Sequence, residues 1–345
     1  MHLIDRIWRG NDALSRSARV ALTPFEVAYR AVTATRGWMY DHSLLRVRPS
    51  AVPVVSVGNL SVGGTGKTPF AAWLAAELAK RGAEPAVVLR GYGGDEARVH
   101  ARLNPEIPVV IEPQRAEGIR RAAANGATVA VLDDAFQHRA AGRAVDVVLI
   151  SAEQWRATPR LLPAGPWREP FRALRRASIA VITRKTADDA TVGELAKTIR
   201  DAAPQLPQAV VHFTLDELRL ASGTAASNVS PLAELARKSV VAIAGIADAD
   251  AFFRQIAEAG GQVEPHPFPD HHRYTTGDIA DIVLRPRGDD IVFVCTLKDA
   301  VKLGVLWPAT APPLWYVSQA LKVESGEEAI EKLLTELAPN STEGS

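Results

Sequence analysis

The pattern of apolar and polar positions between residues 51 and 183 alternates between two kinds of segment. Short runs rich in β-branched residues are separated by longer stretches whose apolar positions recur at helical spacing. Such alternation is typical of βαβ units, in which helices cover buried parallel strands. The apolar runs are Val52–Val57, Ala86–Leu89, Val109–Ile111, Val129–Leu132, Val145–Ile150 and Ile179–Thr183. We therefore predict an α/β domain over residues 51–208, with a parallel sheet flanked by helices.

The pattern changes around residues 203–225, where a proline-containing linker is followed by two short strand-like segments. The alternation then restarts, and a chain of 345 residues exceeds the size at which single cores stop growing. We therefore predict a second, smaller α/β domain over residues 209–337, joined by a strand-like linker, and a disordered polar tail over residues 338–345. The segments behind this prediction are Ala209–Thr214, Leu218–Leu220, Val240–Ala244, a helix over Ala251–Ala259, Ile291–Thr296 and Leu314–Val317.

Residues 1–50 form a locally basic segment with an amphipathic helical pattern. Ala21, Phe25, Ala28 and Val32 share one face of such a helix, and Pro24 interrupts or bends it. The helix could lie on an anionic bilayer surface, or it could pack on the main body with its arginines solvated, and the pattern leaves both interpretations open. The charges are Arg6, Arg9, Arg16, Arg19, Arg30, Arg36, Arg46 and Arg48 against Asp5, Asp12, Glu26 and Asp41, with Arg16, Arg19 and Arg30 roughly opposite the apolar face.

Composition excludes several classes of protein. The sequence has no apolar run of about 18 residues and no secretory signal at its start, so we expect a cytoplasmic protein. The formal net charge of +1 argues against a nucleic-acid-binding protein, which would be strongly basic. Cys295 is the single cysteine, which excludes an internal disulfide and a cysteine-based zinc site.

The strongest chemical signal is Ser-Val-Gly-Gly-Thr-Gly-Lys-Thr at residues 61–68, between an apolar run and a helical stretch. Glycines let backbone N–H groups turn toward an anion, and the following helix adds its positive N-terminal end. The pattern therefore predicts a phosphate-binding loop for ATP, although Ser61 stands where the common motif has its first glycine. Its nucleotide-binding residues are Ser61, Gly63, Gly64, Thr65, Gly66, Lys67 and Thr68. Lys67 would contact the β- and γ-phosphates, and the Thr68 hydroxyl would bind Mg²⁺.

Two carboxylates, Asp133 and Asp134, directly follow the buried run Val129–Leu132. Ligands of open α/β sheets bind at the carboxyl ends of the strands, so these side chains are candidate Mg²⁺ ligands. An acidic surface turn is the alternative. Gln137 and His138 continue the same loop and are candidates for contacting nucleotide or substrate, although such residues more often have a structural role.

Arg168 and Glu169 lie in the proline-rich stretch 161–170, which restricts the backbone strongly. Arg168 could neutralise charge on the transferring phosphoryl group, and Glu169 could assist the metal. An exposed Arg–Glu pair is the alternative.

Residues 268–274, Phe-Pro-Asp-His-His-Arg-Tyr, concentrate titratable groups, and a histidine near a carboxylate is suited to proton transfer at neutral pH. Asp95 and Glu96 follow the glycine-rich stretch 90–94. They are candidates to take a proton from a hydroxyl substrate.

Six segments together resemble the tetraacyldisaccharide 4'-kinase family in order and spacing over roughly residues 15–335. They are Val-Gly-Asn-Leu-Ser-Val-Gly-Gly-Thr-Gly-Lys-Thr-Pro (57–69), Arg-Gly-Tyr-Gly-Gly (90–94), Asp-Asp-Ala-Phe-Gln-His-Arg (133–139), Leu-Pro-Ala-Gly-Pro-Trp-Arg-Glu-Pro (162–170), Phe-Pro-Asp-His-His (268–272) and Lys-Asp-Ala-Val-Lys-Leu (298–303).

The resemblance implies transfer of the ATP γ-phosphate to the 4'-hydroxyl of a tetraacylated glucosamine disaccharide 1-phosphate, which gives lipid IV-A in lipid A biosynthesis. It also favours the membrane interpretation of the N-terminal helix, as peripheral contact with the cytoplasmic face of the inner membrane of a Gram-negative bacterium. We infer no obligate protein partner. The positions that match the family's catalytic dyad are Asp95 and His271. Lys67 and Thr68 match the phosphate and Mg²⁺ residues, Asp133 and Asp134 match its acids, and Arg168 and Glu169 match an active-site pair.

Two other functions remain open from the residues alone. One is a P-loop ATPase or GTPase of the metallochaperone type without a lipid substrate, although Thr296-Leu297-Lys298-Asp299 places its lysine one position late for guanine recognition. The other is a nucleotide-binding docking protein without turnover, against which the titratable segment 268–274 argues.

Overall fold

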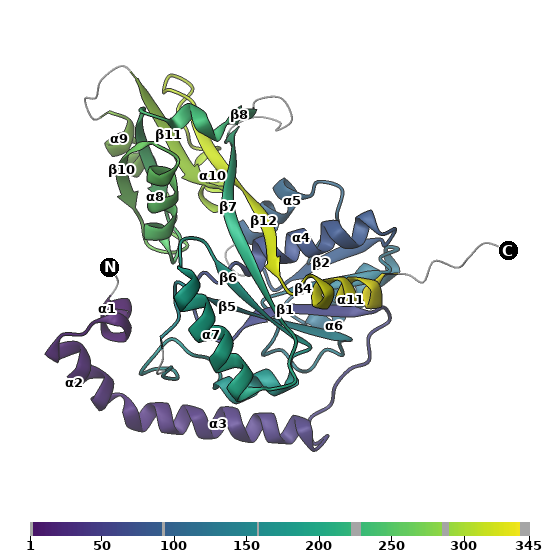
Figure 1. Ribbon diagram of the computed structural model, residues 1–345. Coiled ribbons are helices and arrows are strands. Elements are labelled where there is room, and N and C mark those ends of the chain that lie inside the picture. The colour runs from purple at the N-terminus through teal and green to yellow at the C-terminus, as the bar shows by residue number, and fades with distance from the viewer. Residues whose placement is uncertain (1–2, 92–93, 157–158, 222–228, 285–289, 339–345) are drawn as a thin grey trace. The chain divides into compact units, whose positions relative to one another are not determined.

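The computed structural model describes residues 3–91, 94–156, 159–221, 229–284 and 290–338 (Figure 1). The chain divides into two compact units. Unit 1 contains residues 1–91, 104–211 and 323–345, and unit 2 contains residues 92–103 and 212–322. Compared with the division predicted from sequence, residues 92–103 group with unit 2 and residues 323–337 with unit 1. Tyr92 and Gly93 of the glycine-rich motif lie outside the described residues, as does the predicted tail beyond Ala338.

Unit 1 is built on a parallel sheet whose strands, apart from the edge strand β3, are almost entirely buried. Its strand order is β6-β5-β1-β4-β2-β3. All six residues of β1 are buried, as expected for a parallel strand covered by helices. The strands are β1 (Val54–Asn59), β2 (Pro85–Leu89), β3 (Val109–Ile111), β4 (Val129–Asp133), β5 (Val145–Ser151) and β6 (Ile179–Arg184). The predicted parallel sheet is thereby confirmed.

The helices of unit 1 cover this sheet because their apolar faces complete its core. Helix α4 packs on β1, β2 and β4, α6 on β2, β3 and β4, and α7 on β6, whereas α11 packs on α4. Their bounds are α4 (Lys67–Lys80), α6 (Arg115–Ala124), α7 (Asp189–Ala202) and α11 (Glu327–Leu337), with a 3₁₀ turn η1 (Phe171–Arg176).

Three N-terminal helices also belong to unit 1: α1 (Leu3–Arg9), α2 (Ala13–Ala21) and α3 (Thr23–Asp41), drawn in purple in Figure 1. Asp12 caps α2, and Pro24 lies in the first turn of α3, where its missing N–H has no intrahelical partner to lose. Of the two predicted effects of Pro24, interruption of the helical pattern is therefore the one observed: Pro24 lies at the start of α3, and α2 and α3 are separate helices.

Polar contacts hold these helices to the rest of unit 1, and several of their apolar side chains are exposed. Glu26 is buried and accepts hydrogen bonds from the Arg160 guanidinium at 2.7 Å and from the Leu161 N–H at 2.9 Å. Tyr29 donates its hydroxyl to the Arg168 carbonyl at 3.1 Å, and Trp8 donates to the Pro163 carbonyl. The side chains of Leu14, Val20, Phe25, Val27 and Val32 are 59% to 69% exposed.

In unit 2 four strands pair in parallel in the order β10-β9-β11-β12, and β7 pairs with β8 in antiparallel fashion. The strands are β7 (Gln208–Leu220), β8 (Val229–Pro231), β9 (Ser239–Ala244), β10 (Gln262–Pro267), β11 (Ile291–Thr296) and β12 (Leu314–Ser325). The helices are α5 (Asp95–Leu103), α8 (Ala249–Glu258), α9 (Thr276–Val283) and α10 (Leu297–Leu303), with a 3₁₀ turn η2 (Leu232–Leu235). Strands β7 and β12 begin in one unit and end in the other.

The position of α5 is the feature of unit 2 that matters for the site. Residues 92–103 come from between β2 and β3 of unit 1, yet α5 packs on α10 of unit 2. Arg102 fixes the end of α5 by donating to the Leu220 carbonyl at 2.8 Å. As a result, the first residue of α5, Asp95, belongs to the same unit as the segment 268–274.

Candidate active site

The phosphate-binding loop follows β1 and ends at the first residue of α4. Gly66 precedes the helix with φ of 81°, a left-handed conformation that glycine adopts without the steric cost a side chain brings. The first backbone N–H groups of α4, from Lys67 and Thr68, have no partners within the helix and give its N-terminus a partial positive charge. The loop can therefore bind a polyphosphate.

The side chains of Asn59, Thr65 and Thr183 stabilise this loop through hydrogen bonds. Asn59 is fully buried and donates to the Thr65 hydroxyl at 2.9 Å, and Thr183 donates to the Thr65 carbonyl at 3.0 Å. Gln137 donates to the Asn59 carbonyl at 2.8 Å. Gln137, a candidate for contacting nucleotide or substrate, therefore contacts the end of β1, just before the loop. Sequence reasoning missed Asn59, although a polar residue that ends an apolar strand just before a glycine loop is a usable signal.

Asp133 ends β4 beside the start of α4. The Thr68 hydroxyl donates to Asp133 Oδ2 at 2.8 Å, and Asp133 is only 2% exposed. A threonine hydroxyl and a carboxylate are both oxygen donors, which Mg²⁺ prefers. The two residues thus fit a Mg²⁺ ion as oxygen ligands. Among the described residues there is no cluster of three or more His, Cys, Asp or Glu side chains suited to a metal.

The carboxylate of Asp134 lies between two cationic side chains. Arg168 Nη1 donates to its two oxygens at 3.0 and 3.2 Å, and Lys67 Nζ lies 3.6 Å from Oδ1. Burial acts to raise the pKa of Asp134, but the charges of Lys67 and Arg168 outweigh burial and hold the pKa below its ordinary value. Asp134 also has φ of 52°, a strained conformation of the kind found at functional sites.

The proline-rich turn is held against the phosphate-binding loop by backbone hydrogen bonds. Val62 N–H donates to the Pro166 carbonyl at 2.7 Å, and Arg168 N–H donates to the Leu60 carbonyl at 2.7 Å. Leu60 and Trp167 are buried in one apolar cluster, which fixes the turn further. Arg168 thereby reaches Asp134 and the neighbourhood of Lys67.

The other predicted residues of this loop region have structural partners in the structure. Glu169 forms two hydrogen bonds of 2.7 Å with Arg176, so it is turned to that guanidinium. His138 is half-buried, and burial together with the charges of Arg115 and Arg143 lowers its pKa. Metal binding by Glu169 and substrate binding by His138 stay predictions.

In unit 2, Asp95 and His271 are brought together. Asp95 Oδ2 lies 3.3 Å from His271 Nδ1, with the Asp95 side chain 5% and the His271 side chain 46% exposed. Burial acts to raise the pKa of Asp95, but the hydrogen bond to His271 and the charge of Lys298 outweigh it and lower the pKa to about 2. The hydrogen bond to Asp95 raises the pKa of His271, against the opposing effects of burial and Lys298. Glu96, the next residue of α5, is half-buried.

The segment that carries His271 rests on a fully buried carboxylate, Asp299. Asp299 accepts hydrogen bonds from the Tyr274 hydroxyl, the Gly245 N–H and the Thr296 hydroxyl at 2.9, 2.9 and 2.6 Å. His271 itself has φ of 58°. Sequence reasoning quoted the Lys-Asp dipeptide 298–299 only as part of a motif and gave neither residue a role.

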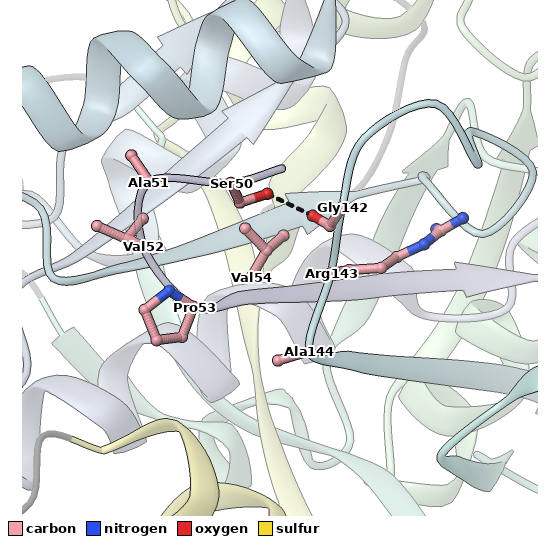
Figure 2. A pocket seen from close by; sticks show the side chains of 8 residues that line it. All are labelled: Ser50, Ala51, Val52, Pro53, Val54, Gly142, Arg143 and Ala144. Carbon is pink, nitrogen blue, oxygen red and sulfur yellow. Dashed lines mark hydrogen bonds between the residues drawn. The ribbon is translucent and has the colours of Figure 1, made fainter. Parts of the chain in front are cut away.

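A pocket of about 370 Å³ lies elsewhere in unit 1 (Figure 2). Its lining residues are Ser50, Ala51, Val52, Pro53, Val54, Gly142, Arg143 and Ala144. They precede or begin β1 and β5, at the opposite ends of these strands from the phosphate-binding loop. The pocket therefore lies at the amino ends of these strands, whereas nucleotides bind at the carboxyl ends.

Comparison with known proteins places these observations in a family. The model of the family "Tetraacyldisaccharide-1-P 4'-kinase" matches residues 18–338. A tetraacyldisaccharide 4'-kinase of Anaeromyxobacter sp. (strain Fw109-5) is 36% identical over 97% of this chain and 96% of that protein. A tetraacyldisaccharide 4'-kinase of Xanthomonas campestris pv. campestris (strain 8004) is 33% identical over 86% of each.

A solved structure is similar as well. The crystal structure of LpxK from Aquifex aeolicus in complex with ATP covers 93% of this chain and 100% of its own, with a TM-score of 0.72 and 27% identity. Similarity in sequence and in fold thus extends across both units and all six motifs. The chain belongs to the tetraacyldisaccharide 4'-kinase family.

Proposed function

We propose that this protein transfers the γ-phosphate of ATP to the 4'-hydroxyl of a tetraacyldisaccharide 1-phosphate. The observation that carries the proposal is the pairing of a buried carboxylate with a histidine in unit 2, Asp95 with His271 at 3.3 Å, in a chain that also has a phosphate-binding loop. A P-loop protein that only hydrolyses nucleotide has no use for a proton acceptor for a sugar alcohol. The metallochaperone-type alternative is therefore disfavoured.

Unit 1 supplies the residues for binding and stabilising the phosphates. The backbone N–H groups of residues 63–68 surround the β- and γ-phosphates, and Lys67 and Arg168 offset the negative charge that develops during transfer. Both cations pair with Asp134 in this structure, so a bound phosphate would compete with that carboxylate for them.

Thr68 and Asp133 are the residues that would hold Mg²⁺, and Glu169 remains a candidate to assist. Bound there, the ion would neutralise part of the negative charge on the phosphates. The hydrogen bond between Thr68 and Asp133 fixes both oxygens before any ligand arrives.

Unit 2 supplies the residues for activating the hydroxyl. A sugar hydroxyl is a poor nucleophile until its proton is accepted during attack. His271 can accept that proton on Nε2 when Nδ1 donates to Asp95, and the Asp95 carboxylate then stabilises the imidazolium that forms. A neutral imidazole is required, so kcat should rise with pH through the raised pKa of His271.

The exposed apolar side chains of the N-terminal helices support a further part of the proposal, peripheral contact with the cytoplasmic face of the inner membrane. Five large apolar side chains of α2 and α3 are more than half exposed, and basic residues such as Arg16 accompany them. This arrangement suits a bilayer surface with anionic lipids, where the acylated substrate would reside. In the part of the chain that the structure describes, none of the helices combines the length and hydropathy needed to cross a bilayer.

Activity is tested by incubating the protein with γ-labelled ATP, Mg²⁺ and tetraacyldisaccharide 1-phosphate. We expect label in the lipid and none when the acceptor lacks its 4'-hydroxyl. Label released only as free phosphate would contradict the kinase and support the ATPase alternative.

Membrane contact is tested by flotation with vesicles containing phosphatidylglycerol. The double variant Phe25→Ser and Val32→Ser should float less than the unmodified protein, because it loses apolar area on α3. Leu284→Ser is the matched control, since Leu284 is an exposed apolar residue of unit 2. Equal flotation of both variants and the unmodified protein would contradict membrane contact through α3.

A further inference from the structure

Lys298, the second residue of α10, contacts the same histidine from the other side. Its Nζ lies 3.1 Å from His271 Nε2 and 3.0 Å from Asp270 Oδ1. Asp270 Oδ1 also accepts the His271 N–H at 3.1 Å, so one carboxylate oxygen holds both the lysine and the histidine backbone. The Lys298 side chain is 25% exposed. The imidazole of His271 is thus contacted at each ring nitrogen, by Asp95 at one and by Lys298 at the other.

The chemistry of these two neighbours fixes where the imidazole proton lies. A lysine ammonium carries three donors and no acceptor, so its contact with Nε2 requires a lone pair on that nitrogen. A carboxylate only accepts, so Asp95 requires the proton on Nδ1. The two contacts therefore select one neutral tautomer, and it is the tautomer whose Nε2 can accept a proton.

We infer that Lys298 is a positioning residue for proton transfer. Its ammonium group opposes protonation of His271 and keeps Nε2 unprotonated until the acceptor hydroxyl replaces the ammonium there. The inference rests on the proposed kinase function. When the hydroxyl arrives, Lys298 keeps its ion pair with Asp270, so the ammonium is not left without a partner. The hydroxyl proton then passes to Nε2 as the hydroxyl oxygen bonds to the γ-phosphorus, the bond from that phosphorus to the β–γ bridging oxygen breaks and ADP leaves, while the Nδ1 proton stays with His271.

The charged groups that face His271 come from each element packed against it. Asp95 belongs to α5, Asp270 precedes His271 in its own segment, and Lys298 belongs to α10. Lys302, one turn further along α10, donates to the carbonyl of the neighbouring His272 at 3.3 Å. Lys298 is the cation in direct contact with the ring, so removing it should make protonation of His271 easier.

The experiment compares Lys298→Met with the unmodified protein by ¹⁵N NMR of labelled histidine, a readout that needs no turnover. The protein has eight histidines, and His271→Gln identifies the signal. In the unmodified protein we expect the neutral tautomer with its proton on Nδ1. In Lys298→Met the titration midpoint of His271 should rise by about one pH unit, since a cation no longer opposes the imidazolium.

Kinetics give the second readout. On the acidic limb of the pH profile, kcat of Lys298→Met should fall about tenfold, because a one-unit change in pKa changes the neutral fraction tenfold. At high pH its kcat should approach that of the unmodified protein, and the KM for ATP should not change. Loss of structure alone would lower kcat equally at every pH.

Two further variants complete the test. Lys298→Arg keeps the charge and should restore the midpoint and the acidic limb, and Lys238→Met, which removes a lysine paired with Asp290 on the surface, should move neither. An unchanged His271 midpoint in Lys298→Met, or a proton on Nε2 in the unmodified protein, would overturn the inference. Absence of lipid phosphorylation by the unmodified protein would instead overturn the kinase proposal and leave the NMR result to decide the role of Lys298.

Discussion

The phosphate-binding residues of unit 1 and the Asp95–His271 pair of unit 2 are constructed in contrasting ways. In unit 1 the polar side chains stand at the ends of buried strands or at the start of α4, and the side chain of Lys67 is 13% exposed while Asp133 is 2% exposed. In unit 2 a buried carboxylate contacts a half-exposed histidine in an irregular segment. Positions in unit 1 follow from the sheet, whereas the pair in unit 2 depends on where α5 packs.

This contrast suggests that substitutions affect the residues of the two units differently. The residues of unit 1 are fixed by the core, so their substitution should remove charge while the fold persists. The Asp95–His271 pair in unit 2 is held by a few polar contacts around residues 270–274. The pKa values of the pair should therefore respond to single neighbouring charges. The following predictions test that difference.

The largest effect is expected from Lys67→Ala. Asp134 keeps its two hydrogen bonds from Arg168, so the fold should remain intact while phosphate charge goes uncompensated. We expect kcat to fall by about 10³-fold, on the scale of losing a donor to transition-state charge. Lys80→Ala, which removes a lysine on the surface of the same helix, is the control for a general charge effect. A Lys67→Ala enzyme with near-normal turnover would exclude this lysine from catalysis.

A smaller effect is expected from His271→Ala. Proton acceptance in the transition state is worth on the order of 10²-fold or more, so kcat should fall by at least about that factor. Binding of ATP should not change, because the phosphate-binding loop belongs to unit 1. Steady-state kinetics together with ATP titration separate the two. If kcat stayed the same and ATP affinity fell, the assignment of roles to the two units would be wrong.

The smallest effect concerns stability in acid. The pKa of Asp95 is lowered to about 2 in the folded protein from an ordinary 3.8, so its ionised form stabilises the fold at pH values above about 4. This stabilisation, on the order of 2 kcal/mol, should be lost as the pH falls from about 4 toward 2. The free energy of unfolding of the Asp95→Asn variant, measured by denaturation, should therefore depend less on pH in that range than that of the unmodified protein. An identical acid transition in both proteins would contradict the lowered pKa.

The sequence predicted the parallel sheet well, and it placed residues 61–66 correctly in a loop between a strand and a helix, because both follow from local periodicity. The six predicted strands of unit 1 match β1 to β6 within about two residues at each end. Asp133 and Thr68 come together because β4 is paired beside β1 and both strands end at one edge. The sequence did not predict β10, whose Gln-Val-Glu-Pro-His-Pro is too polar to be distinguished from a loop.

The remainder of the site depends on contacts that spacing cannot reveal. Pairing of Asp95 with His271 was expected only from resemblance to a family, because nothing near residue 95 indicates that α5 leaves the unit of its neighbours. The contact of Lys298 with His271 was not predicted at all. A lysine at the start of a helix usually faces solvent, and only the bend of residues 270–271 brings the ring to it.

The buried Glu26 carboxylate has a practical consequence for testing the proposed membrane contact by truncation. Deleting residues 1–41 would remove the exposed apolar side chains of α2 and α3, but it would also deprive Arg160 of its counter-charge and the Leu161 N–H of its acceptor. Those two residues begin the stretch that ends at Arg168, so such a truncated protein would loosen an arginine that is proposed to act in catalysis. Its loss of activity would then not isolate the contribution of a bilayer, and exchanging exposed side chains is the safer route.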